Sequence, residues 1–394
     1  MSISRHVLSK TLLSLAITSA FPSLLLADAA ADKEIEALWQ TVEQLQQQVT
    51  EAEEWKSPNT LIHMAGYADI NFASIEGANG TASENSFSAG TFAPIFHYQV
   101  TDQVMMGAEL AFTVDKAGET SVEMEYFSID YFMNDYATLV MGKFLSPLGQ
   151  FRQNGHPSWI NKLPSAPQGF GHVGAAPLAD VGMQVRGGFK MGSVNANYAA
   201  YAGNGVAAEM NPADPTEIEE PHSPGFNADL DGSKNAGGRF GIYLPSSKLD
   251  LGLSWATGKA AEFDETGGPN GGPLFENKRD WDFIGADFTW HRGGFDLRGE
   301  YVDQTYGARA DGSGPKATFD AYYVQAAYRF PSTKWEAVAR TSKFNTPEDT
   351  LDRYTVGVNY IFTSSVIAKL AYEGNDNNAS TAVDKVLVQM AYGF

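Results

Sequence analysis

The feature that most constrains the fold is an alternation of apolar and polar residues, which recurs in segments of roughly ten residues. The chain ends on one such segment, "VLVQMAYGF", in which every second residue from Val386 to Phe394 is apolar. From residue 61 onward about sixteen of these segments follow one another without helical periodicity. A period of two is typical of strands with two unlike faces. The last apolar face is covered if the strands close into a barrel surrounded by lipid.

The connections between these segments alternate between short and long. The short ones are Thr101-Asp102, Asn134-Asp135, Gly192-Ser193, Ser246-Ser247, Gly293-Gly294, Ser332-Thr333 and Ser364-Ser365. The long ones are 77–85, 115–120, 146–179, 203–235, 259–279, 307–317, 344–351 and 375–382. Tight turns at one end and long loops at the other are typical of an outer-membrane barrel, and a soluble β-sandwich would rarely be so regular.

Aromatic residues gather beside the short turns, as an interfacial girdle would require. They are Phe132, Trp290, Phe295, Phe330, Trp335, Phe362 and Phe394. We therefore predict an all-β fold, a transmembrane antiparallel β-barrel of about sixteen strands over residues 58–394. Its last strand is expected to pair with the first, near "MAGYADINF".

The N-terminus has the layout of a secretory signal peptide. Arg5 and Lys10 precede an apolar stretch over 12–26, and Ala27-Asp28-Ala29 resembles a cleavage site. A membrane-anchoring helix is the alternative, but Pro22 interrupts the short apolar run. We assign residues 1–29 to the signal peptide.

A short heptad segment follows over residues 30–57. Its apolar seam consists of Ile35, Leu38, Val42, Leu45, Val49 and Ala52. This spacing predicts a periplasmic coiled coil that supports self-association, and an amphipathic helix packed on a domain is the alternative.

A sixteen-stranded barrel is wide enough for an aqueous channel. The alternation predicts an inner face with charges of both signs. Among the expected lumen-facing residues are Lys143, Arg186, Arg340, Arg353, Lys369, Glu109, Glu123 and Glu125. Ion-paired wall structure is the alternative role for each of them. Most of the formal net charge of -20 then lies in external loops and in the heptad segment.

The longest connection, over 146–179, differs from the other loops. It carries basic residues but no acid before Asp180. We predict that it forms the pore constriction, with Arg152, His156, Trp159 and Lys162 as the constriction residues. An ordinary surface loop is the alternative.

The strand that enters this loop reads "GKFLSPLGQF", residues 142–151. It resembles the G-[QK]-F-x-x-P-F-G stretch of the phosphate-selective porin family, with Leu148 where that family often has Phe. The resemblance implies a trimeric, sixteen-stranded, passive diffusion channel whose third external loop folds inward. It does not fix phosphate as the solute. The heptad segment is similar to the periplasmic extension of some trimeric porins.

Other classes of function find little support. The chain has no cysteine and no G-x-S-x-G, H-E-x-x-H or P-loop motif. Asn227, Asp229 and Asp231 resemble half of a calcium loop, but Gly238 stands where a ligand is needed. The histidines show no ligand spacing, and a pI near 4.7 disfavours nucleic acid. We therefore expect no enzyme activity, no metal and no cofactor.

The leading prediction is an outer-membrane porin of a Gram-negative bacterium, a passive channel for small hydrophilic, anionic solutes. Its expected partners are membrane lipid, lipopolysaccharide and two further copies of the chain. The alternative is a structural barrel whose coiled coil tethers the membrane to the cell wall or a partner.

Overall fold

The structure is a computed structural model that describes residues 63–76, 83–172, 174–264, 274–378 and 382–394. The predicted signal peptide and coiled coil lie outside these residues. The chain divides into two units, Met1–Thr60 and Leu61–Phe394, and all described residues belong to the second. Within them, no helix is long and apolar enough to cross a membrane. The helical element in these ranges is one π-helical turn, η1 (Phe151–Gly155).

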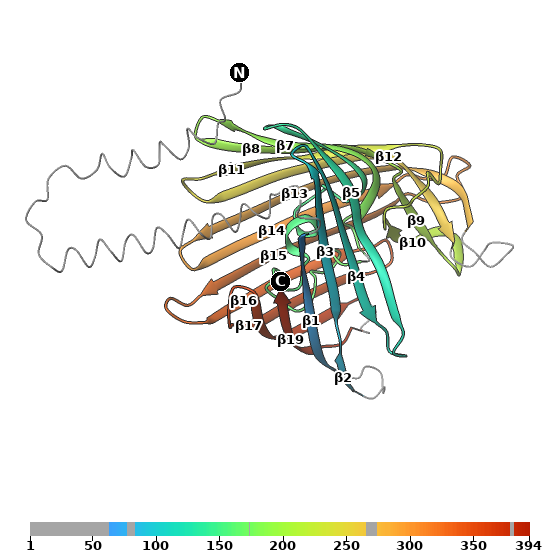
Figure 1. Cartoon of the computed structure of the whole chain (residues 1–394). Helices are drawn as coiled ribbons and strands as arrows, with labels where there is room; N and C mark the ends of the chain where they lie inside the picture. The colour runs from blue at the N-terminus through green and yellow to red at the C-terminus, as the bar shows by residue number, and fades with distance from the viewer. Residues whose placement is uncertain (1–62, 77–82, 173, 265–273, 379–381) are drawn as a thin grey trace, which may run out of the picture. The chain divides into compact units, whose positions relative to one another are not determined.

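The strands follow the predicted order along the chain (Figure 1). They are β1 (His63–Ile75), β2 (Glu84–Ser88), β3 (Thr91–Thr101), β4 (Val104–Val114), β5 (Thr120–Asn134), β6 (Ala137–Leu145), β7 (Ala179–Met191), β8 (Val194–Gly203), β9 (Val206–Asn211), β10 (Asp214–His222), β11 (Asn235–Leu244), β12 (Leu249–Asp264), β13 (Leu274–Arg292), β14 (Phe295–Tyr306), β15 (Ala317–Arg329), β16 (Trp335–Asn345), β17 (Thr350–Ile361), β18 (Val366–Asn377) and β19 (Lys385–Gly393).

The sheet closes into a barrel because β1 pairs with β19, antiparallel, with Tyr67 opposite Gly393. The backbone N–H of Phe394 donates to the carbonyl of Gly66 at 3.0 Å. Of the 19 described strands, β2 and β3 both pair with β1 as two parts of one wall strand, and β9 and β10 form an extra hairpin. The wall therefore has 19 − 1 − 2 = 16 strands. The predicted all-β antiparallel barrel is confirmed.

The two faces of β19 show why the alternation predicts this fold. Val386, Val388, Met390 and Tyr392 are 40–46% exposed, whereas Gln389 and Ala391 between them are buried. Exposed apolar side chains continue on the same face around the wall, where lipid can cover them.

The aromatic girdle is present on most of the predicted positions. Phe295, Phe330, Trp335 and Phe362 are exposed beside the short turns. Phe132 differs, because it lines a cavity inside the barrel near the same end. Its position in the sequence next to a turn gave no information on which face it occupies.

Two long connections differ from the predicted ones. Strands β12 and β13 extend into the expected 259–279 loop and pair as far as Asp264 and Leu274. The 203–235 connection contains the β9–β10 hairpin, which the sequence analysis did not predict. Strand β9 also pairs in parallel with β12, with Val206 opposite Ala260. The hairpin is therefore joined to the barrel wall at the end where the long loops lie (Figure 1).

Candidate pore constriction

Residues 146–178, here called the inner loop, cross the interior of the barrel between β6 and β7. The backbone N–H of Phe151 donates to Glu300 on β14 at 2.8 Å. Arg152 pairs with Glu125 on β5, and Lys162 Nζ lies 2.7 Å from Glu336 on β16. Strands β5 and β16 are far apart in the sheet order, so one loop reaches both only through the lumen.

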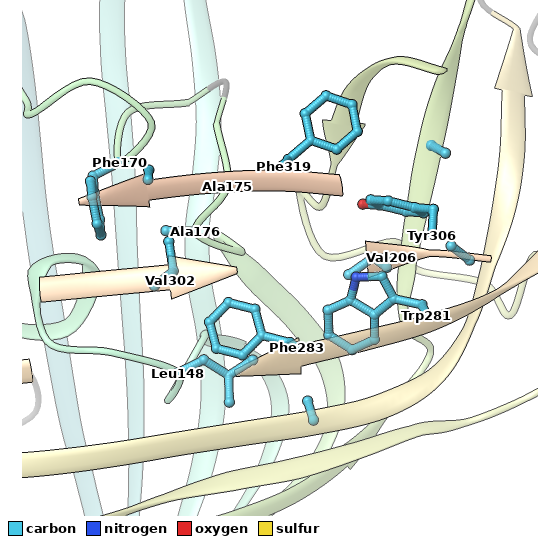
Figure 2. Close-up of a cluster of buried hydrophobic side chains, with 14 of the residues drawn as sticks. Leu148, Phe170, Ala175, Ala176, Val206, Trp281, Phe283, Val302, Tyr306 and Phe319 are labelled. Carbon is cyan, nitrogen blue, oxygen red and sulfur yellow. The ribbon is translucent and has the colours of Figure 1, made fainter. Parts of the chain in front are cut away.

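Apolar packing holds one part of the inner loop against the wall. Figure 2 shows Leu148 and Phe170 of the loop in a buried cluster with Trp281, Phe283 and Phe319 of the wall. These three wall residues come from β13 and β15 and are almost completely buried. A polar inner face is expected from the sequence, but the wall is apolar here. This side of the barrel is therefore filled by packed side chains.

Two buried cations of the wall bind the backbone of the loop. Lys369 Nζ on β18 donates to the carbonyls of Ser158 and Asn161, the latter at 2.6 Å. Arg340 on β16 donates to the carbonyl of Ser165 at 3.0 Å. Both cations are at most 3% exposed. From the inner side of the wall they fasten the loop in place.

Close packing supplements these hydrogen bonds near Trp159 and Leu163. A Cβ atom added to Gly393 would lie 2.7 Å from the indole of Trp159, so the ring rests directly on the end of β19. Leu163 is fully buried in a cluster with Ala327, Val338 and Ala371. The absence of a side chain at Gly393 therefore leaves room for Trp159, which is one of the predicted constriction residues.

The predicted basic residues of the loop are compensated by acids of the wall. Arg152 and Glu125 are both buried, and their ion pair joins the loop to β5. His156 Nε2 lies 3.7 Å from Glu109, whose carboxylate accepts a hydrogen bond from Tyr67 at 3.0 Å. Because Arg152 and Lys162 each face a carboxylate, the constriction carries little uncompensated positive charge.

Cavities large enough to hold water lie on both sides of the inner loop. The outer cavity, of about 640 Å³, lies toward the long loops. Its charged lining residues are Asp69, Glu123, Glu125 and Arg152, with His156 and His172 beside them. Two inner cavities, of about 460 and 210 Å³, lie toward the short turns and share Gln153, Gln184 and Arg186. The larger one is also lined by Arg239.

The remaining predicted residues occupy different settings. Arg186 lies 2.6 Å from Asp130, and its side chain is 46% exposed, whereas Asp130 is buried behind it. Arg353 donates to Asn375 at 2.6 Å and lies 3.8 Å from Glu373. Of the two arginines that line the inner cavities, Arg186 is the more exposed, since the side chain of Arg239 is only 11% exposed.

Glu123 and Lys143 were both expected in the lumen. Glu123 lines the outer cavity, where its side chain is 47% exposed and lies 3.9 Å from His172. Lys143 is half-buried, and its cross-strand partner on β5 is the exposed Phe127. It is not one of the residues that line the outer cavity.

Several residues that shape the site were not among the predicted site residues. Tyr67, Asp130, Gln153 and Gln184 surround the charged groups, and Glu300 accepts the loop backbone. Alternation predicts the inner face for Glu300. Asp130 is an odd number of residues from Glu125, so alternation alone would place it outside, and a bulge in β5 opposite Glu109 brings it inside. No local pattern indicates which inner residues meet the loop.

Comparisons with known proteins agree with this architecture. Residues 246–394 match the family described as phosphate-selective porin O and P. The matched segment does not include the 142–151 motif. A comparison with curated sequences gave no match.

Three solved structures are similar to the barrel. One is OmpT with loop L8 deleted, an outer membrane protein of Vibrio cholerae, at 11% identity and a TM-score of 0.57, covering 84% of this chain and 99% of that one. The second is an anion-selective porin from Comamonas acidovorans, at 12% and 0.56, covering 84% and 99%. The third is the outer membrane channel DcaP of Acinetobacter baumannii, at 11% and 0.57, covering 84% and 97%. At these identities the likeness concerns the fold. The chain is thus a sixteen-stranded barrel of the porin fold whose residues 246–394 match the phosphate-selective porin family.

Proposed function

We propose that the protein is a passive diffusion channel for small hydrophilic solutes in the outer membrane of a Gram-negative bacterium. The observation that carries the proposal is a closed barrel with an inner loop that has polar, charged cavities on both sides. The apolar outer face suits a lipid environment, and lipopolysaccharide would meet the end with the long loops. The proposed activity is transport without catalysis.

The proposed route descends from the outer cavity past the Arg152–Glu125 pair to the inner cavities. The outer cavity is acidic, because Asp69, Glu123 and Glu125 outnumber Arg152. The inner cavities are smaller and present Arg186 to water. Charge acts most strongly where a pore is narrow, since salt screens charges beyond about 8–10 Å. We therefore propose a modest anion preference that depends on Arg186, with Arg152 and Lys162 largely compensated.

Planar-bilayer recording of the purified protein tests both statements. The channel function predicts stepwise ohmic conductance, whereas the structural-tether alternative predicts none. Reversal potentials across a salt gradient then report selectivity. We expect wild type to prefer anions, Arg186→Glu to lose that preference and Glu123→Gln to strengthen it. A wild type that prefers cations until Glu123 is neutralised would show that the outer cavity controls permeation.

Assembly as a homotrimer is part of the proposal. One structurally similar protein, OmpT of Vibrio cholerae, is described in a trimer form. The heptad segment over residues 30–57 is proposed to support the same assembly from the periplasmic side.

A further inference from the structure

The β9–β10 hairpin brings together three side chains that can bind a metal. Glu209, Glu220 and His222 each offer one ligand atom, and these atoms all lie within 4.8 Å of one another. We propose that they form a site for a divalent transition-metal ion of the zinc class at the long-loop end of the barrel. This site is independent of the proposed channel function.

The strand pairing explains why these three residues share one face. Glu220 and His222 are two residues apart on β10, so both point to the same side of the strand. Glu209 lies directly opposite Glu220 on β9, and cross-strand partners also share a face. The hairpin thus presents two carboxylates and one imidazole as a compact group.

Packing on both faces of the hairpin fixes the group. The ring of His222 stacks on Phe263 of β12, with centroids 5.0 Å apart and planes 5° apart. On the opposite face, Met210 and Ile218 are buried in the large apolar cluster. Because this packing already restricts the ligand side chains, they lose less conformational entropy when an ion binds.

Charge favours an ion at this position. Two carboxylates directly opposite each other on neighbouring strands repel, and a divalent cation between them replaces repulsion with attraction. The donor set of two oxygens and one imidazole nitrogen suits Zn²⁺ or Co²⁺ better than Ca²⁺, which takes more ligands, all of them oxygen. All three side chains are partly exposed, so an ion can reach them from solution.

The chain contains a matched control in a second group of similar composition. Glu123, Glu125 and His172 also place ligand atoms within 4.8 Å. There, however, the buried Glu125 carboxylate already pairs with Arg152. The positive charge of that guanidinium opposes a metal ion beside Glu125.

Titration calorimetry tests the proposal with the untagged, detergent-solubilised chain after chelator treatment. We expect one Zn²⁺ per chain and much weaker heat with Ca²⁺. His222→Gln and Glu209→Gln should each weaken Zn²⁺ binding by more than the roughly 10- to 100-fold that loss of an outer-shell partner costs. His172→Gln should leave binding unchanged.

Heat-modifiable gel migration of each variant shows whether the barrel has folded. Zn²⁺ affinity that is equal in wild type and His222→Gln would overturn the proposal, as would a wild type that binds no Zn²⁺. Loss of binding in His172→Gln instead would place the ion at the second group.

Discussion

Replacing Lys369 with methionine should release the inner loop while the barrel remains folded. Lys369 Nζ donates to the carbonyls of Ser158 and Asn161 and to Gln389. Methionine has a similar length but no donor, so both loop carbonyls would be buried without a partner. The backbone hydrogen bonds between β18 and its neighbours do not involve this side chain.

The expected magnitude follows from these contacts. A buried acceptor left without a partner costs about 1–3 kcal/mol, so two of them cost about 2–6 kcal/mol. Burial of the methionine side chain returns roughly 1–2 kcal/mol. We expect closure of the loop to be weakened by about 3 kcal/mol, which corresponds to roughly a 150-fold rise in the open population.

Thiol labelling measures that population, because the chain has no cysteine of its own. Leu163→Cys places a single thiol at a fully buried position of the loop, and labelling requires the loop to open. We expect labelling in the Lys369→Met background to be faster by about two orders of magnitude, in line with the estimate above. Lys190→Met, which removes an exposed lysine of β7, is the control and should change nothing. Equal labelling rates in all three backgrounds would show that apolar packing alone holds the loop.

Two further predictions concern the ends of the chain. Deletion of Phe394 should reduce assembly of heat-modifiable barrel in membranes several-fold, because the Phe394 ring stacks on Phe92 and its backbone pairs with Gly66. Phe394→Tyr keeps an aromatic ring and should assemble normally. Equal assembly of both variants would contradict this prediction. Val42→Asp with Leu45→Asp places charges in the predicted heptad seam and should lower the temperature at which trimers dissociate on gels, while the barrels stay folded. An unchanged dissociation temperature would mean that the segment has another role.

The fold was predictable because the outer face of a membrane barrel is set by each strand separately. On β19, alternate residues from Val386 to Tyr392 are exposed on the outer face whatever the neighbouring strand contains. The alternation was weaker on β13, where Phe283 faces inward and Ile284 outward and both are apolar. The buried apolar cluster between loop and wall was therefore not predicted, although its loop residues Leu148 and Phe170 are themselves apolar.

The contacts of the site were not predictable, because they join residues distant in sequence. Lys162 and Glu336 are 174 positions apart, and only the path of the loop brings them together. The proposed metal site shows the same limit. Glu220 and His222 have a spacing that a strand would place on one face, but Glu209 joins them only once the hairpin forms.

The arrangement of charges explains why a loop without acids can lie stably inside a barrel wall. Loop cations Arg152 and Lys162 meet wall carboxylates, while wall cations Arg340 and Lys369 meet loop carbonyl groups. Burial of an unpaired charge costs several kcal/mol, so each of these groups requires its partner. The ion pairs that secure the loop also neutralise its charge, so the loop contributes little to the electric field that a passing ion would experience. The selectivity that we propose therefore depends on groups such as Arg186 and Glu123. Their side chains still reach water, and they lie on opposite sides of the loop.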